Sequence, residues 1–331
     1  TVAGCGMPGT NQRQGTWTES ESGPVRFPKR WHVLPHELVF ALFLGATFFR
    51  LWAEVGLTHT STLLYGLFLG ALIWLVTWVQ YHPSRARWRA RLLGCLAVSA
   101  LSYFCLAEAV PAMYSPAGLE STGWHKDAAL QQWDTAIFGN APRELMLAQP
   151  GAWVSDLMMI CYFFFFYYIV GGLLYYLLKD LNIFRICLVG FCTLYALGYV
   201  GYTLMPATGP LADLGPRTGG WITEVGGGFI AQRTNGVDVF PSIHMAGSLF
   251  LLVFDFWHRR THFWVALLPT IGLWISTVYL RYHYGVDLLA GIVLAIGCLW
   301  LVRWYAQSRL CEEVEAECAA SSDGKVTEST A

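Results

Sequence analysis

Residues 157–178 read LMMICYFFFFYYIVGGLLYYLL, a stretch of apolar and aromatic residues that carries no charge. A helix that crosses the ~30 Å hydrocarbon core of a bilayer needs roughly 20 such residues. The stretch from Leu63 to Val79 is also uncharged. The composition agrees, because 55% of the 331 residues are hydrophobic and only 13% are charged, against about 25% in an average soluble domain. The sequence therefore predicts an all-α fold, a polytopic membrane helix bundle.

Apolar stretches of this length predict about eight transmembrane helices. They lie at 37–57, 62–81, 92–113, 156–178, 184–205, 242–257, 262–280 and 284–305. The sixth is the shortest of them, and the first contains two charged residues.

These spans predict four regions along the chain. Residues 1–36 form a polar cytoplasmic N-terminal segment, and residues 37–113 contain three accessory spans. Residues 114–305 form the catalytic helical bundle, which is followed by an acidic cytoplasmic tail at 306–331.

The distribution of Lys and Arg predicts how the chain is oriented. With eight spans, fifteen of the 21 basic residues fall on the side that holds both ends of the chain, and five fall on the other side. Since loops rich in Lys and Arg stay inside the cell, both termini are predicted to be cytoplasmic. The long segments 114–155 and 206–241 then face the extracytoplasmic side, and loops of this length are often functional. The net charge of −1 does not favour nucleic acid as a partner.

The cysteines and the pair His32 and His36 predict neither a metal site nor a disulfide framework. The nine cysteines contain no CxxC pair, and six of them lie in apolar stretches, which is typical of small buried hydrophobic residues. His32 and His36 are four residues apart, but Pro35 between them disfavours a regular helical metal pair. The sequence predicts no cofactor.

Ionisable residues in membrane segments are costly and indicate function, and two stretches combine them near one end of the last three spans. The first is FPSIH at 240–244, where Ser242 is the predicted N-cap of a helix whose backbone N–H groups could hold a phosphate. The second is RYHYGVD at 281–287, where His283 and Asp287 share a helix face if the stretch is helical. The two spans between these stretches return the chain to the same side of the membrane.

Two histidines, a carboxylate and nearby arginines suit phosphoryl transfer without a metal. The hypothesis is that neutral His283 attacks phosphorus and that Asp287 fixes its tautomer and stabilises the imidazolium. His244 would protonate the leaving oxygen. Arginines would offset the charge on the phosphoryl oxygens, and the candidates are Arg281, Arg217 and Arg233.

PSIH at 241–244, followed by HYGVD at 283–287, resembles the type 2 phosphatidic acid phosphatase superfamily. The chain is more closely similar to its inositolphosphotransferase branch, which includes inositol phosphorylceramide synthases. WDTAIFG at 133–139 and LMPATGP at 204–210 also resemble that branch, and the resemblance covers roughly residues 130–300. The alternative for Asp134, inside the first of these stretches, is that it caps a short interfacial helix.

The resemblance implies a role for each residue of the two His motifs. His283 is the implied nucleophile and forms a phosphohistidine, Asp287 is its partner, and His244 is the acid and base. Ser242 is an implied phosphate contact.

Three departures from the phosphatase pattern favour a transferase-like enzyme over simple hydrolysis of phosphatidic acid. Thr277 stands where the third phosphatase motif has Arg, and Ile243 stands where the second has Gly. The first phosphatase motif, with its Lys and Arg-Pro, has no counterpart, since residues 206–210 contain no basic residue.

We therefore expect a lipid phosphotransferase or phosphatase with an extracytoplasmic active site, acting on a phospholipid or another lipid phosphate. The sequence predicts no oligomeric state. One alternative is a metal-dependent membrane hydrolase in which His244, His283 and Asp287 are the ligands. Another is a transporter with an ionisable relay, for which the further candidates are Arg50, Glu54 and Glu108.

Overall fold

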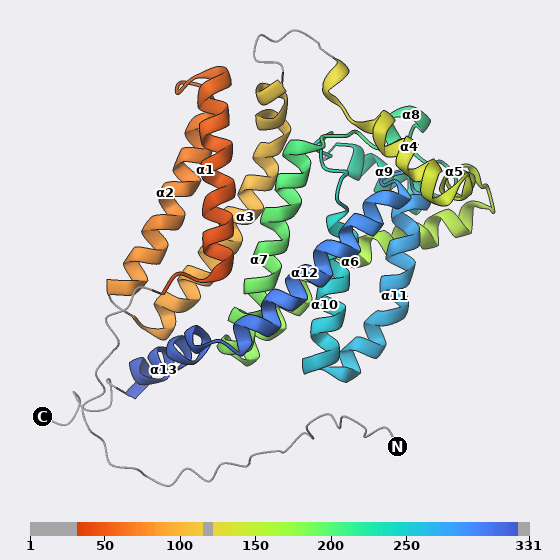
Figure 1. Ribbon diagram of the computed structural model, residues 1–331. Coiled ribbons are helices and arrows are strands. Elements are labelled where there is room, and N and C mark those ends of the chain that lie inside the picture. The colour runs from red at the N-terminus through yellow and green to blue at the C-terminus, as the bar shows by residue number, and fades with distance from the viewer. Residues whose placement is uncertain (1–31, 82, 115–121, 233, 324–331) are drawn as a thin grey trace, which may run out of the picture.

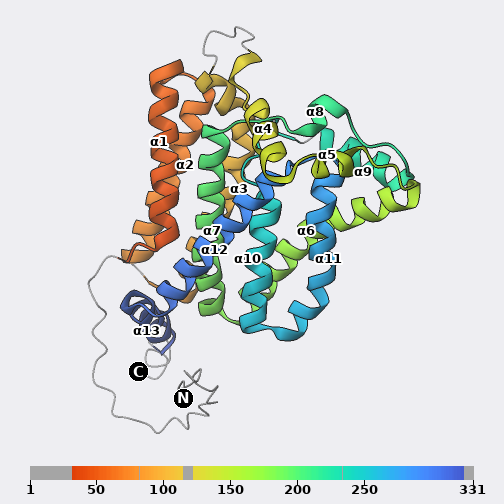
Figure 2. The ribbon, with the colours of Figure 1, turned by 45° about the vertical axis from the view of Figure 1, so that its right-hand side comes forward.

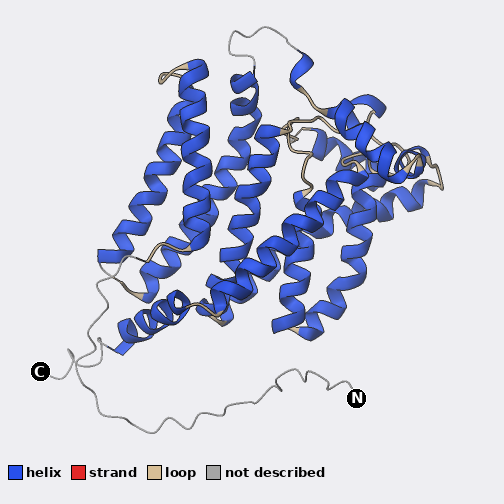
Figure 3. Cartoon of the chain, in the orientation of Figure 1, coloured by secondary structure: helices blue, strands red, loops and turns tan. Residues whose placement is uncertain are grey.

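The computed structural model describes residues 32–81, 83–114, 122–232 and 234–323, and these ranges contain helices and connecting loops but no strand (Figures 1 and 3). The predicted all-α fold is therefore confirmed. Most of the predicted N-terminal segment 1–36 lies outside the described residues.

Seven helices are long and apolar enough to cross a membrane, which confirms the prediction of a multi-pass membrane protein. They are α1 (Pro35–Val55), α2 (Thr60–Tyr81), α3 (Arg85–Tyr114), α6 (Ala152–Lys179), α7 (Leu181–Leu204), α11 (Arg260–Tyr279) and α12 (Gly285–Ala306). The remaining predicted span is α10 (Ile243–His258), which is apolar but has only 16 residues. At 1.5 Å per residue it is about 24 Å long, so it is shorter than the hydrocarbon core.

The third span begins earlier than the sequence predicted. The basic run from Arg85 to Arg91, which precedes the predicted start of this span at residue 92, forms the first turns of α3. Arg91 is buried, and its Nε and Nη2 atoms donate to both carboxylate oxygens of Glu37 in α1 at 2.6 Å. This pairing lets the guanidinium lie inside the bundle, because a buried charge needs a partner of opposite sign.

The short helices gather at one end of the bundle (Figures 1 and 2). They lie within the two long segments between spans, and they are η1 (Thr122–Trp124), α4 (Asp127–Phe138), α5 (Ala141–Leu147), α8 (Pro210–Leu214) and α9 (Trp221–Ala231). The starts of α10 and α12 lie at this same end, whereas α13 (Arg309–Asp323) lies at the opposite end. The two long segments thus share one side, as two intervening spans require.

Helix α7 is the centre of the bundle. Within its apolar window 72% of the residues are buried, against 28% to 44% in the other six candidate spans. It packs against α1 and α3 on one side and against α6, α10 and α12 on the other. The helices of the predicted accessory region 37–113 therefore join those of the predicted catalytic region 114–305 through α7, although the division into these regions stays a prediction.

Candidate active site

The fold brings His244 and His283 together. His244 is the second residue of α10, and His283 lies in the turn between α11 and α12. Nδ1 of His244 and Nε2 of His283 are 3.2 Å apart, which is hydrogen-bond distance. The antiparallel hairpin of α10 and α11 returns the chain to its starting side, so two residues 39 positions apart meet.

Asp287 lies on the other edge of the His283 ring. Its Oδ2 atom is 3.4 Å from Nδ1 of His283 and accepts the backbone N–H of Tyr284 at 2.8 Å. Both the histidine and the aspartate are buried. A proton on Nδ1 that faces the carboxylate leaves the lone pair of Nε2 pointing toward His244, and this is the tautomer that a nucleophilic imidazole needs.

The order of these groups bears on the alternative of a shared metal ion. His283 lies between its partners, with Asp287 at Nδ1 and His244 at Nε2. A metal ion held by all three side chains requires their ligand atoms to converge on one point. The two partners instead approach opposite edges of one ring, so the arrangement does not bring the three ligand atoms to one point.

Ser242 couples the two helix starts. Its side chain is the N-cap of α10 and accepts the backbone N–H of Met245 at 3.3 Å, as the sequence predicted. Its own N–H donates to the carbonyl of Asp287 at 3.0 Å. Gly291, one turn after Asp287, makes this approach possible, because a Cβ atom there would lie 2.7 Å from the carbonyl oxygen of Ser242.

Aromatic rings from α6 form a wall beside the histidine pair. The ring of His244 lies 5.0 Å from that of Tyr162, 4.5 Å from that of Phe165 and 6.4 Å from that of Phe166, between centroids. Tyr162 also packs against Tyr282, the residue before His283, at 4.7 Å. The aromatic run that opens at Tyr162 therefore excludes water from one side of the pair.

Asp134 supports the start of α12 from a different helix. Its Oδ1 atom accepts the backbone N–H of Val286 at 2.8 Å, so it satisfies an amide of the first turn of α12. It lies near the end of α4, whose N-cap is Lys126, so the alternative in which Asp134 caps that short helix is not what the structure shows. Burial raises the pKa of this carboxyl group, and the backbone amides of Val286 and Gly285 oppose that rise.

Asp127 is a second acidic residue whose role the sequence did not reveal. It accepts the backbone N–H groups of Thr208 at 3.0 Å and Gly209 at 2.8 Å, and the hydroxyl of Tyr284 at 3.1 Å. It thereby ties the stretch 204–210 to α4 and to the turn before α12. Asp127 and Asp134 are seven residues apart on one helix, and this two-turn spacing on a shared face was the available signal.

The predicted arginines lie together, but their contacts are to backbone carbonyls. Arg217 donates through Nη1 to the carbonyl of Met146 and through Nη2 to that of Ala148. Arg281 donates through Nε to the same Met146 carbonyl at 3.1 Å and through Nη1 to that of Leu214 at 2.7 Å. Burial and the nearby charge of Arg217 lower the pKa of Arg281.

These contacts distinguish the three candidates for phosphate binding. Both terminal nitrogens of Arg217 are occupied, and its guanidinium lies 3.8 Å from the centre of the Tyr279 ring. Nη2 of Arg281 has no hydrogen-bond partner in the described part of the chain. Arg233 lies outside the described residues.

A cavity of about 90 Å³ with a mixed polar and apolar lining opens beside this network. It shares Asp134 and Tyr284 with the contacts that hold the start of α12. Its other hydrogen-bonding side chains come from α4, α8 and the start of α5, and they are Gln131, Thr135, Asn140, Arg143 and Asp213.

A known protein family matches most of this region. The family model described as the PAP2 superfamily matches residues 128–301, which is 174 of the 331 residues. The match begins in α4 and ends in α12, so it contains His244, His283 and Asp287. No curated protein and no solved structure matches the chain.

Proposed function

The chain belongs to the PAP2 superfamily, and we propose that it is a membrane phosphotransferase or phosphatase that acts on a lipid phosphate through a phosphohistidine on His283. Membership in this family implies an enzyme of the phosphatase or phosphotransferase type. The observation that carries the proposal is the geometry of His283, which has His244 at 3.2 Å from Nε2 and Asp287 at 3.4 Å from Nδ1.

In the first half-reaction the lone pair on Nε2 of His283 attacks phosphorus. The bond between phosphorus and the leaving oxygen breaks, and protonated His244 gives its proton to that oxygen. Asp287 holds the proton on Nδ1 and stabilises the positive ring. The hydrogen bond between the two histidines opens in this step, because the phosphoryl group must lie between their facing nitrogens.

In the second half-reaction a hydroxyl compound attacks the phosphohistidine. His244, now neutral, takes the proton of that hydroxyl, the P–N bond breaks and His283 returns to its starting state. Water as the acceptor makes the enzyme a phosphatase, whereas an alcohol makes it a transferase.

Three groups that lie within two residues of His244 or His283 in the sequence suit the phosphoryl oxygens. Nη2 of Arg281 is a charged donor without a partner among the described residues, and the Ser242 hydroxyl keeps its proton while its oxygen caps α10. The amide-rich start of α10 favours negative charge. We assign Arg217 a supporting role, since it holds the carbonyls near Arg281 in place.

We propose an inositolphosphotransferase-like reaction, in which the transferred phosphoryl group carries a polyol headgroup and another hydroxyl compound is the acceptor. The departures at Thr277 and Ile243 favour a transferase. The cavity beside Tyr284 offers amide, carboxylate and guanidinium groups that could bind several hydroxyls of such a headgroup. The distribution of basic residues supports cytoplasmic termini and an extracytoplasmic site, and the aromatic wall from α6 suits lipid chains that enter from the side.

The test is incubation of the purified full chain with a panel of phosphorus-labelled lipids, with and without candidate alcohols as acceptors. We expect His283→Ala and His244→Ala each to abolish turnover while the protein stays folded in detergent. His258→Ala, on the same helix as His244 but at its far end, is the matched control and should keep activity.

The products identify the reaction. Release of inorganic phosphate alone would identify a phosphatase, and a new phosphorylated compound would identify a transferase. Full activity in either histidine variant of the pair would remove the proposed mechanism.

A further inference from the structure

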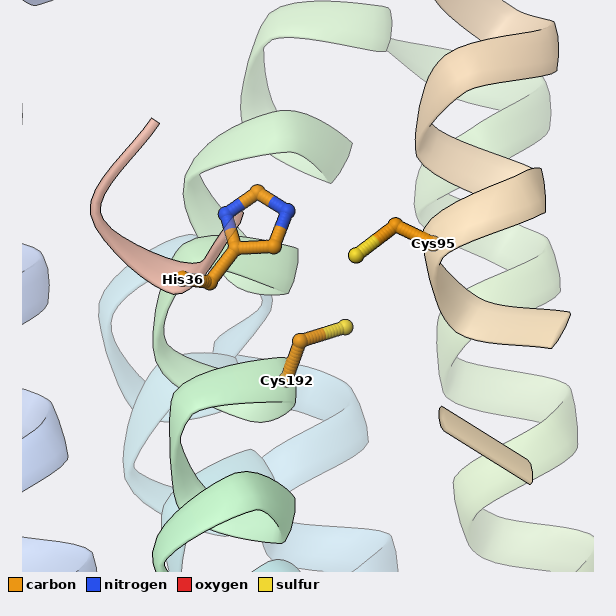
Figure 4. A group of neighbouring side chains, drawn as sticks. All are labelled: His36, Cys95 and Cys192. Carbon is orange, nitrogen blue, oxygen red and sulfur yellow. The ribbon is translucent and has the colours of Figure 1, made fainter. Parts of the chain in front are cut away.

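A second cluster of ligand-type side chains lies away from the histidine pair. His36 comes from the start of α1, Cys95 from α3 and Cys192 from α7 (Figure 4). The start of α1 is at the end of the bundle where α13 lies, opposite to the starts of α10 and α12 (Figures 1 and 2). The ligand atoms of the three residues all lie within 4.8 Å of one another, and all three residues are buried.

The burial of the His36 imidazole indicates that this cluster binds a ligand. The exposed fraction of His36 is 0%, and the weak contact of its ring with the Cys95 thiol leaves at least one ring nitrogen without a hydrogen-bond partner among the described residues. Leaving a buried polar group unpaired costs about 1–3 kcal/mol, and such groups in native proteins are nearly always satisfied. Figure 4 shows the thiol groups of Cys95 and Cys192 directed toward the space beside the imidazole.

A buried ion pair fixes the positions of two of the three residues. His36 directly precedes Glu37, and Cys95 lies one turn after Arg91 on the same face of α3. Glu37 and Arg91 form the bidentate pair at 2.6 Å, and Arg91 also donates to the carbonyl of His32 at 2.6 Å. The start of α1 is therefore held against α3 by contacts that do not depend on a metal, as a preorganised site requires.

We propose that His36, Cys95 and Cys192 bind a soft d¹⁰ metal ion, Zn²⁺ or Cu⁺, which links α1 and α3 to the central helix α7. One imidazole and two thiolates are ligands that these ions prefer. Two thiolates balance the charge of Zn²⁺, which suits a buried site, and binding releases the two thiol protons to solvent. The sequence predicted no metal here, because the three ligands are far apart along the chain and form no CxxC motif.

The distances fit with small side-chain movements. Metal–sulfur bonds of about 2.3 Å and metal–nitrogen bonds of about 2.0 Å place ligand atoms about 3.5–3.8 Å apart in a tetrahedral site. Starting from separations within 4.8 Å, each ligand atom moves inward by less than about 1 Å. The site does not involve His244 or His283, so its test is independent of the proposed reaction.

The experiment measures metal content in the full chain, purified in detergent under reducing conditions without added metal. We expect about one equivalent of Zn or Cu per chain, with X-ray absorption showing nitrogen and sulfur ligands and identifying the ion. A chain purified empty should instead bind one Zn²⁺ or one Cu⁺, each added alone, and its thermal unfolding temperature should rise on binding.

Variants assign the metal to this site. Cys95→Ser, Cys192→Ser and His36→Ala should each lose the stoichiometric metal, whereas Cys105→Ser on α3 and Cys187→Ser on α7 are matched controls that should keep it. Three results would overturn the proposal: no stoichiometric binding by either route, metal retained in all three site variants, or a disulfide between Cys95 and Cys192 in the reduced preparation. The titration of the unsubstituted chain decides the matter even if a variant fails to fold.

Discussion

Replacing Gly291 by alanine tests whether the contact between α10 and α12 sets the geometry of the histidine pair. The added Cβ atom would lie 2.7 Å from the carbonyl oxygen of Ser242 and 3.0 Å from Cβ of Met245. Carbon and carbonyl oxygen normally approach to about 3.3–3.6 Å, so the two helix starts must separate by about 0.6 Å or more. Gly291 lies one turn after Asp287 and Ser242 lies two residues before His244, so this movement acts directly on the pair.

The expected effect of Gly291→Ala is larger on catalysis than on folding. Overpacking of this kind costs about 1–3 kcal/mol of stability. A misplacement of about 1 Å between reacting groups can lower the rate about a hundredfold, so we expect kcat to fall by about tenfold to a hundredfold. The measurements are kcat on the lipid substrate found in the panel and thermal unfolding in detergent.

Gly297→Ala is the matched control on the same helix. A Cβ atom there meets nothing within 4 Å, so activity should stay at the level of the unsubstituted protein, with stability unchanged or raised by up to about 1 kcal/mol. A folded Gly291→Ala protein with unchanged kcat would refute the reasoning, since the two helix starts would then not set the position of the histidines.

Three further substitutions test other contacts. Asp134→Ala should lower the stability of the folded state by about 1–3 kcal/mol in thermal unfolding and reduce kcat, because the amide of Val286 loses its acceptor. Asp134→Asn should restore most of the stability and most of kcat. Equal kcat in the two variants would contradict the positioning role of Asp134. Glu37→Ala should destabilise the protein by about 3–5 kcal/mol, because it leaves Arg91 buried without its ion-pair partner. The double variant with Glu37→Leu and Arg91→Met should unfold near the temperature at which the unsubstituted protein unfolds. A single variant as stable as the double variant would count against the buried ion pair. Arg281→Gln should lower kcat/KM about tenfold to a hundredfold if its free nitrogen binds the phosphoryl group, whereas lost stability with unchanged kcat/KM would leave it a structural residue.

The sequence revealed most of the membrane helices because each depends on a local property. The uncharged stretches around Leu63 and Leu157 are helical as expected, since twenty apolar residues suit a span whatever their neighbours. The start of α3 was predicted too late, because the depth of Arg91 depends on Glu37 in another helix. Hydropathy alone marks a buried arginine as a loop residue.

The sequence predicted the part of the active site that lies at the two ends of the hairpin formed by α10 and α11. His244 and His283 flank two adjacent spans, so the predicted topology brought them to one end. Asp127 was not recognised, and the partner of Asp134 was not predicted, because both residues bind backbone amides of distant segments and no pattern in residues 127–134 indicates which amides these are. The carbonyl contacts of Arg217 and Arg281 were equally hidden, since the folds of two long segments determine them.

The cluster of His36, Cys95 and Cys192 shows why spacing rules miss sites in helix bundles. Such rules recognise ligands that are close in sequence, as on one loop or one helix turn. Here each ligand comes from a different helix, and the packing of α1 and α3 on α7 brings them together. Composition can indicate that such cysteines are buried, but not that they lie beside a buried imidazole.

The most direct test of the central claim is to trap the phosphoryl group on the enzyme. The purified chain is mixed briefly with a lipid substrate labelled at phosphorus, quenched in alkali and analysed by peptide mass spectrometry. The account predicts an acid-labile label on His283, which is absent in His283→Ala and absent or greatly reduced in His244→Ala. Turnover without any labelled histidine, or a label on a residue other than His283, would contradict it.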